Sequence, residues 1–329
     1  SRQLNWNTLT PPNFPIGASS RELGMNNRVE YKEHIGVMKK EVTDILTSLP
    51  NGIFIDATYG YGSHFNYFLD NVLNLNFIGF DRDSEAIANA QLGHKVYKLN
   101  FSKIKDYLIK SNIRDLSGVF YDFGVSSHQI DSNNRGFSFQ HNSNLDMRMD
   151  QTQNKSAFEV INQYTLNELI TIFKKYGELQ KSKKIANSIV NSRPIYTTNE
   201  LKNIIQKSMP PQNPKFVEKA IRKVFQSIRM EVNDELSEIY DSLNGVKDFI
   251  QKDGAIICLT YHSLEDKIVK DFFKDLTTGC VCDPKITVCI CMQLPEFKYG
   301  KVKKLKPNYS EILSNSRSKS ATLRYGIKL

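Results

Sequence analysis

The sequence has 329 residues and contains no long apolar run. A stretch of about 18 consecutive apolar residues would be needed for a membrane-spanning helix, and none is present. A basic segment followed by an apolar run and small residues, which marks a secretory signal, is also missing. We therefore expect a cytoplasmic protein if the source is bacterial, or a protein of an organelle matrix if it is eukaryotic.

Cysteine is scarce, with five residues in the whole chain, which argues against a disulfide framework. Cys258 lies in the apolar run AIICLTY and is expected in the core. The other four occur in CVCDPKITVCIC at Cys280, Cys282, Cys289 and Cys291. A thiolate metal site and a hairpin with paired thiols both fit this spacing, and we assign no metal ligand.

Acidic residues are outnumbered, which gives a net charge of +9 and a pI of about 9.1. The excess is concentrated in residues 298–329, where nine lysines and arginines face the single acid Glu311. Such a tail is either a solvated flexible end or a contact for phosphate groups. The overall charge favours a polyanionic partner.

Three regions follow one another along the chain. Residues 1–30 show no periodicity and are expected to be a poorly ordered extension. Short apolar runs alternate with helical patterns up to residue 130, which predicts an α/β fold with a doubly wound, mostly parallel sheet. Residues 131–230 contain only helical patterns, and residues 231–329 return to the helix–strand rhythm. We predict a discontinuous domain, 31–130 and 231–329, interrupted by a helical domain at 131–230.

The segment DATYGYGSH joins the first predicted strand to the next helix and contains Gly60 and Gly62. Glycine lets a backbone approach a ligand closely, and a helix N-terminus offers free N–H groups. Asp81 follows Gly62 by nineteen residues and ends the second predicted strand. An acid at this place accepts hydrogen bonds from ribose hydroxyls, so the pair predicts a nucleoside site.

A third glycine, which dinucleotide-binding turns use for packing under a pyrophosphate, is lacking in GYGSHF. S-adenosyl-L-methionine carries no phosphate and fits this turn better than a nicotinamide dinucleotide. Asp122 ends the fourth predicted strand, so Asp56, Asp81 and Asp122 are expected at the same edge of the sheet. An ordinary tight turn is the alternative to a ligand site.

The motifs HIGVMKKEV, DATYGYGSH, FDRD, YDFGVSSHQID, RGFSF, LDMRMD, YGE, VFQSIRMEVNDEL, YHSLEDKIVK and SRSKSATLR occur in order from His34 to the end of the chain. This succession resembles the RsmH (MraW) family of 16S-type ribosomal RNA cytosine-N4 methyltransferases. The resemblance implies a Rossmann-like class I methyltransferase fold with a helical insertion. It also implies small-subunit ribosomal RNA, free or in an assembling subunit, as partner, while the oligomeric state stays open.

The resemblance carries the family's cofactor contacts over to the glycine turn and to the strand ends. They are Gly60, Gly62, Ser63, His64, Asp81, Phe101, Asp122 and Gln129. Ser63 stands where the family usually has glycine, and its side chain either weakens cofactor binding or adds a hydrogen bond.

Methylation of a cytosine amino group needs a group that accepts its N–H and a pocket for the flipped base. We predict Asp122, Asp146, Arg148 and His262 as the catalytic residues. Capping of a helix is the alternative for His262. LDMRMD is either a wall for the flipped base or a structural latch between the domains. A non-catalytic RNA-binding assembly factor and a methyltransferase for another nucleic-acid amine are the alternative functions.

Overall fold

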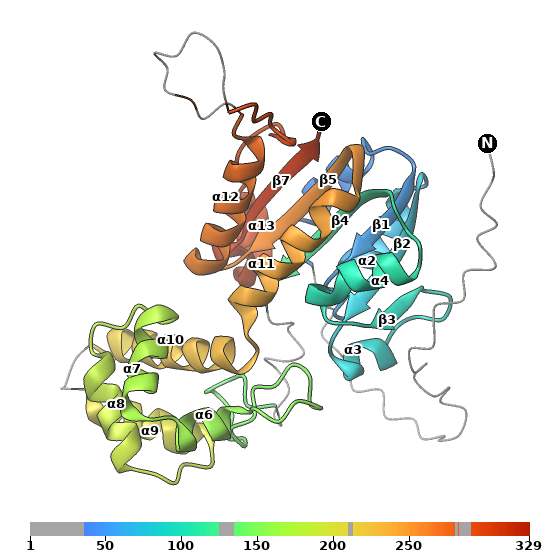
Figure 1. Ribbon diagram of the computed structural model, residues 1–329. Helices are drawn as coiled ribbons and strands as arrows, with labels where there is room; N and C mark the ends of the chain where they lie inside the picture. Colours follow the sequence, from blue (N-terminus) through green and yellow to red (C-terminus); the bar gives the residue numbers. More distant parts are fainter. Residues whose placement is uncertain (1–35, 125–134, 210–212, 280–281, 283–290) are drawn as a thin grey trace. The chain divides into compact units, whose positions relative to one another are not determined.

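The computed structural model describes residues 36–124, 135–209, 213–279, 282 and 291–329. The chain divides into two compact units, each described by itself (Figure 1). Unit 1 comprises Ser1–Gly124 and Glu238–Leu329, and unit 2 comprises Val125–Ser237. The sequence placed the corresponding boundaries at residues 130/131 and 230/231.

Unit 1 is built on a seven-stranded sheet with the order β3-β2-β1-β4-β5-β7-β6. The strands are β1 (Gly52–Asp56), β2 (Leu75–Asp81), β3 (Val96–Lys98), β4 (Leu116–Phe123), β5 (Ile250–Thr260), β6 (Phe297–Tyr299) and β7 (Thr322–Lys328). β1 to β5 are parallel to one another, whereas β7 runs antiparallel between β5 and β6. The predicted α/β fold with a mostly parallel sheet is therefore confirmed.

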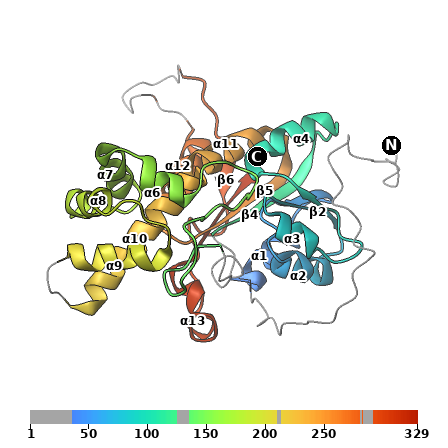
Figure 2. The same cartoon turned by 90° about the horizontal axis from the view of Figure 1, so that it is seen from below.

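Helices cover both faces of this sheet (Figure 2). They are α1 (Lys39–Leu46), α2 (Ser63–Asn71), α3 (Ser84–Ala88), α4 (Ile104–Lys110), α11 (Glu235–Val246) and α12 (Ser263–Thr277), while the short helix α13 (Tyr309–Ser314) has no buried residue. Alternate residues of each strand pack against the helices on opposite faces of the sheet, because successive side chains of a strand point to opposite sides. Ile55 packs in the core with α4, α11 and α12, and its neighbour Phe54 packs in the core with α1 and α2.

The basic C-terminal segment contains β7, a strand that the sequence did not predict. Five of its seven residues are buried, and Arg324 forms a two-pronged ion pair with Asp266 of α12 at 2.7 and 2.9 Å. Lys328 forms an ion pair with Glu296. These two basic side chains are therefore used inside unit 1 and are not free for phosphate.

Unit 2 contains five helices within its described residues. They are α6 (Ala157–Gln163), α7 (Leu166–Lys175), α8 (Ser182–Asn191), α9 (Thr198–Ser208) and α10 (Pro214–Val232). α6, α7 and α9 each begin with a capping box, in which a Ser or Thr and a Glu three residues later bond each other's backbone N–H groups. Asn213 caps α10, and Pro214 occupies its first turn, where the missing N–H costs nothing.

Apolar faces of the five helices form a separate core in unit 2. Phe173, Ile189, Leu201 and Ile228 are fully buried in it, and Met147 joins them from the preceding loop. Across the described parts of both units, no helix is both long and apolar enough to cross a membrane.

Candidate active site

Three aspartates mark the carboxyl edge of the parallel strands. Asp56 ends β1, Asp81 ends β2, and Asp122 is the last residue but one of β4. The strand order runs outward in one direction from β1 through β2 to β3 and in the other from β4 to β5. Open α/β sheets bind ligands at the carboxyl edge beside such a reversal. The fold thus brings the predicted row of carboxylates to a ligand-binding position.

The turn after β1 has left-handed backbone conformations at two glycines, Gly60 (φ 55°) and Gly62 (φ 77°). A Cβ at Gly62 would lie 2.7 Å from the Tyr59 hydroxyl, so this position excludes any side chain. Among the described residues, a Cβ at Gly60 would have only the Thr58 carbonyl oxygen within 4 Å, at 3.9 Å. The Gly60 backbone is therefore left open to a ligand, which is what close approach of a cofactor requires.

Asp81 is tied to this turn by its own carboxylate. Its Oδ2 accepts the Gly60 N–H at 2.7 Å, and its Oδ1 accepts the Asp83 N–H at 2.8 Å. Burial raises the pKa of Asp81, and the two backbone N–H bonds oppose that rise. Each carboxylate oxygen has two acceptor positions, so one on each oxygen stays available for a ribose hydroxyl.

Asp56 is completely buried beneath the same turn. Its Oδ1 accepts the Thr58 N–H at 3.1 Å, and within the described residues its Oδ2 has no hydrogen-bond partner. Burial raises the pKa of Asp56 to about 8. A pKa in this range favours the protonated form of the carboxyl group at neutral pH, which no local sequence pattern indicates.

Asp122 makes two hydrogen bonds and has His64 as a third close neighbour. Tyr261 donates its hydroxyl hydrogen to Oδ1 at 2.7 Å, and the Asp122 N–H donates to Thr58 Oγ1 at 2.7 Å. His64 Nδ1 lies 3.6 Å from Oδ2, beyond hydrogen-bond distance. Within the described residues, Oδ2 therefore has room to accept a hydrogen bond from a substrate.

Tyr261 directly follows β5, at the same edge of the sheet as the three aspartates. Burial and the neighbouring charge of Asp122 raise its pKa well above the ordinary value. Its ring also packs on Gly124, where an added Cβ would lie 3.0 Å from a ring carbon. Tyr261 and Asp122 are separated by 139 positions, so no local motif reveals this hydrogen bond.

His64 and Ser63 connect the glycine turn to the segment that precedes α1. His64 is buried, with Nε2 2.8 Å from the Val37 carbonyl oxygen, and burial lowers its pKa although the charge of Asp122 opposes this. The Gly36 N–H donates to Ser63 Oγ at 2.9 Å. Of the two effects expected for a serine at this position, the added hydrogen bond is observed, and it goes to the protein backbone.

Phe101 lies just beyond β3, partly exposed, with its ring edge-on to Tyr121 and Phe123. The Arg82 guanidinium is 5.9 Å from the centre of the ring. Arg82 also forms an ion pair with Glu238 at 2.7 Å. Phe101 thus offers a fixed apolar surface near Asp81, which suits the adenine predicted there.

His262 is the N-cap residue of α12. Its Nδ1 accepts the Glu265 N–H at 3.4 Å, and its Nε2 lies 2.7 Å from Glu265 Oε1, although not in a hydrogen-bonding direction. The capping alternative therefore describes its observed contacts. Gln129 lies outside the described residues, as do Cys280 and Cys289 of the cysteine-rich segment.

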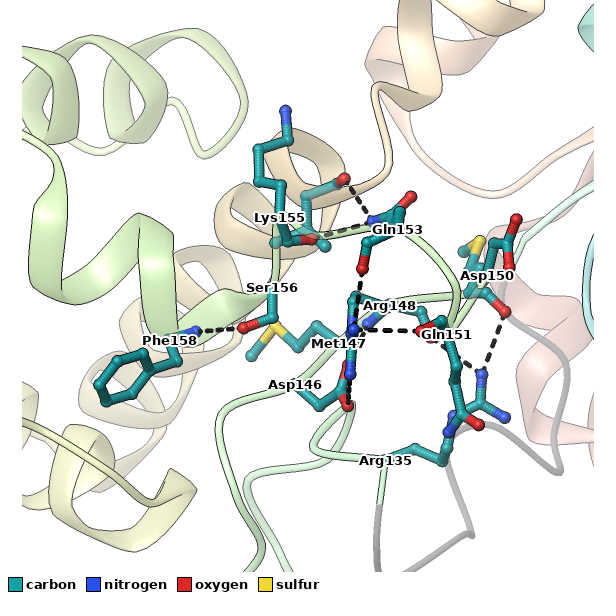
Figure 3. A network of polar contacts seen from close by, with 12 residues as sticks. Arg135, Asp146, Met147, Arg148, Asp150, Gln151, Gln153, Lys155, Ser156 and Phe158 are labelled. Atoms are coloured by element: carbon teal, nitrogen blue, oxygen red, sulfur yellow. Dashed lines mark hydrogen bonds and ion pairs between the residues drawn. The ribbon is translucent and has the colours of Figure 1, made fainter.

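LDMRMD lies in unit 2, where Asp146 and Arg148 bind each other (Figure 3). Arg148 donates from Nε to Asp146 Oδ1 at 2.8 Å and from one terminal nitrogen to Oδ2 at 2.9 Å. Its other terminal nitrogen donates to the carbonyl oxygens of Gln151 and Gln153. The Arg148 side chain therefore links Asp146 to the backbone of Gln151 and Gln153 within the same loop.

Further contacts fix this loop to the helices of unit 2. Met147 is fully buried with φ 59°, and its carbonyl oxygen accepts a hydrogen bond from Asn233 Nδ2. Arg135 donates to the carbonyl oxygens of Arg148 and Met149 (Figure 3). These contacts hold LDMRMD within unit 2, which is a structural role, while the wall for the base and the latch between the domains both stay predictions.

Comparison with known proteins decides the family. The model of the MraW methylase family matches residues 31–328, nearly the whole chain. The chain belongs to this family. The resemblance found in the sequence is therefore confirmed, and with it membership of a group of methylases.

Two relatives in this family carry the name "Ribosomal RNA small subunit methyltransferase H". The protein from Mycoplasmopsis synoviae (strain 53) is 41% identical over 303 residues, which covers 90% of this chain and 98% of the relative. The protein from Caldicellulosiruptor bescii is 40% identical over 307 residues, with coverage of 90% and 99%. A crystal structure of an rRNA methylase from Streptococcus thermophilus is 9% identical, with a TM-score of 0.38 and coverage of 88% and 95%. At that score the structural likeness adds nothing to the family assignment.

Proposed function

We propose that the protein transfers a methyl group from S-adenosyl-L-methionine to N4 of a cytidine in small-subunit ribosomal RNA. The observation that carries the proposal is the family match together with relatives named for small-subunit ribosomal RNA methylation. The position of Asp122, with one carboxylate oxygen held by Tyr261, supports an amine as the acceptor. The cytosine-N4 specificity is the finer part of the proposal.

The residues at the strand edge fit this cofactor. Gly60 leaves open space above a left-handed turn, Asp81 keeps acceptor positions for two hydroxyls, and Phe101 offers a flat apolar surface. When bound, S-adenosyl-L-methionine supplies a methyl group on a positively charged sulfur. Gly62, Ser63, His64 and Gln129 complete the proposed cofactor contacts.

Asp122 has the proposed role of proton acceptor. The lone pair of a cytosine amino group is delocalised into the ring, so the nitrogen becomes nucleophilic only when its N–H is held and then removed. Oδ1 already accepts the Tyr261 hydroxyl, whereas Oδ2 accepts no hydrogen bond within the described residues, so Oδ2 is the oxygen proposed to accept the amino proton. Tyr261 keeps the carboxylate in one orientation, which is the usual contribution of a positioned group.

Unit 2 is proposed to contact the RNA. Asp146, Arg148 and His262 stay predictions for contacts with the substrate, although their observed bonds favour structural roles. The enzyme is proposed to act in the cytoplasm if the source is bacterial and in an organelle matrix if it is eukaryotic.

Labelled S-adenosyl-L-methionine and small ribosomal subunits or naked rRNA test the proposal. We expect label on one cytidine, located by mass spectrometry of nuclease fragments. Asp122→Asn should lower the rate by about a hundredfold or more, the usual contribution of a general base, while cofactor binding in a calorimetric titration is retained. Label on a guanine, or an Asp122→Asn variant with full activity, would contradict the assignment.

A non-catalytic RNA-binding assembly factor is the alternative from another functional class. It would bind small subunits yet show no affinity for the cofactor. The open turn at Gly60 and the retained carboxylates of Asp81 and Asp122 favour the enzyme.

A further inference from the structure

Unit 2 carries a cluster of lysines where α8 and α10 begin. Lys181 precedes α8, Lys184 lies in its first turn, and Lys215, Lys219 and Lys223 lie in the first half of α10. Together with Phe216 these residues are called the α8–α10 basic surface. Figure 1 shows the two helices in the same bundle.

Two contacts show that residues 177–181, just before α8, lie beside α10, one near its start and one in its second half. The Lys181 Nζ atom lies 5.8 Å from the centre of the Phe216 ring. A Cβ on Gly177, in the turn before α8, would lie 2.6 Å from the hydroxyl oxygen of Ser227. Phe216, Lys219, Lys223 and Ser227 are spaced by three, four and four positions, so they follow one side of α10. The connection between α7 and α8 therefore runs along this side.

The charges of the surface are not neutralised within the described residues. None of its five lysines lies within 4.0 Å of a carboxylate oxygen there, whereas Lys155 of the same unit reaches both Glu231 and Asp234. Glu218 of α10 is already bound by Arg222 at 2.8 Å, and Glu178 is the other acid in the neighbouring turn. The surface has a clear positive excess, which suits a chain of phosphates.

Phe216 gives the surface an apolar element. Its side chain is 47% exposed although it stands on a helix with a well-buried face. An exposed aromatic ring among lysines is the combination that single-stranded nucleic acids use, because a base stacks on the ring while cations contact the backbone. Stacking of this kind tolerates any base.

We propose that the α8–α10 basic surface binds a single-stranded stretch of the ribosomal RNA substrate, with phosphates on the lysines and one base on Phe216. This inference rests on the proposed function and adds a defined contact to it. It assigns a role in substrate binding and none in methyl transfer.

Matched lysine variants test the electrostatic part. Lys215→Gln/Lys219→Gln removes two charges from the surface, and Lys202→Gln/Lys207→Gln removes two from α9 of the same unit. With about 0.7 counterions released per phosphate, the first variant should flatten the slope of log affinity against log salt by about 1.4. Affinity for naked small-subunit rRNA should fall roughly tenfold at 0.15 M salt, while the control keeps the wild-type slope.

Phe216→Ala tests the stacking part, with Tyr196→Ala as control because Tyr196 is 54% exposed in the same unit. We expect a fivefold or larger loss of affinity at unchanged salt slope for Phe216→Ala and no loss for Tyr196→Ala. Thermal unfolding and transfer at saturating RNA should be unchanged in all four variants, so that only KM rises.

The outcomes separate the two proposals. If Lys215→Gln/Lys219→Gln and its α9 control show the same salt slope and the same affinity for RNA, the proposed RNA contact at the α8–α10 basic surface is wrong. Normal binding of naked rRNA with weakened binding of assembled subunits also contradicts this contact, because it indicates a ribosomal protein as the partner. A wild-type protein that binds RNA through this surface but methylates nothing overturns the proposed function and leaves the surface standing.

Discussion

Asp56 shows how strongly one buried side chain can respond to pH. Its folded-state pKa of about 8 stands above the ordinary value of 3.8 because the group is completely buried. Between these two values the folded protein holds a proton that the unfolded chain has released. The free energy of unfolding therefore falls as pH rises from about 4 to about 8.

Asp56→Asn is expected to remove this pH dependence, because an amide has nearly the same shape and does not ionise. Wild type should lose roughly 1.4 kcal/mol relative to the variant for each pH unit between 5 and 7. Urea unfolding at pH 5, 6 and 7 measures the difference, in which all other titrating groups cancel. A constant difference across this range would show that Asp56 is not the group concerned.

Tyr261→Phe deletes one hydroxyl and leaves the buried ring. The hydrogen bond to Asp122 is worth about 1.5–3 kcal/mol because its acceptor is charged, so kcat should fall about tenfold or more. The loss should appear mainly in kcat, because the hydroxyl orients the proposed proton acceptor.

Tyr325→Phe is the matched control, since Tyr325 is also a buried tyrosine of the sheet whose hydroxyl is bonded to the backbone N–H of Lys301. It should leave kcat nearly unchanged. If both variants lower kcat alike, Tyr261 has only a packing role.

The site could be predicted in part at the level of residues. Asp81 and the glycine turn could be predicted, because their spacing and their position after predicted strands are typical of nucleoside-binding sites. The protonation of Asp56 and the Tyr261–Asp122 bond could not be predicted. Both depend on burial and on contacts that only the folded chain creates.

The loop around Asp146 and Arg148 is an element whose stability depends on one ion pair. Arg148→Ala removes four side-chain hydrogen bonds and should destabilise unit 2 by about 1–3 kcal/mol. Arg222→Ala, in an exposed pair with Glu218, should cost less than about 1 kcal/mol. Denaturant unfolding followed by circular dichroism compares them.

Activity then separates the two interpretations of this loop. A latch predicts that Arg148→Ala retains the wild-type transfer rate per folded molecule at low temperature. Loss of transfer with unchanged stability would instead support the catalytic role that the sequence suggested.

Among the strands, prediction succeeded where burial leaves a run of apolar residues. β4 is almost entirely buried and reads as LSGVFYDF. β7 has the sequence TLRYGIK, whose charged residues interrupt the apolar pattern by which a buried strand is predicted. Arg324 can be buried because it pairs with Asp266, which lies on a separate helix and is not evident from the local sequence. β6 has three residues, too few for any alternation to show.

At the scale of the molecule, unit 2 has its own core and an uninterrupted sequence. A fragment of residues 125–237 should therefore fold alone, with cooperative thermal unfolding and dispersed amide signals. Phe173→Ala in the same fragment should lower its stability by about 3–5 kcal/mol, as expected for a fully buried ring. A fragment without cooperative unfolding would show that unit 2 needs unit 1 to fold.

The antiparallel strand β7 lies between β5 and β6, although it is the last of the seven along the chain. A ribosome making this protein must therefore finish residues 322–328 before β5 gains its second neighbour. Until then the backbone N–H and C=O groups on that edge of β5 are unpaired. An exposed apolar edge strand of this kind can pair with a strand of another chain and cause aggregation. Unit 2 emerges earlier as one continuous stretch and is free to fold first. The order of synthesis thus makes unit 1 the part of the protein that most needs protection while it is being made.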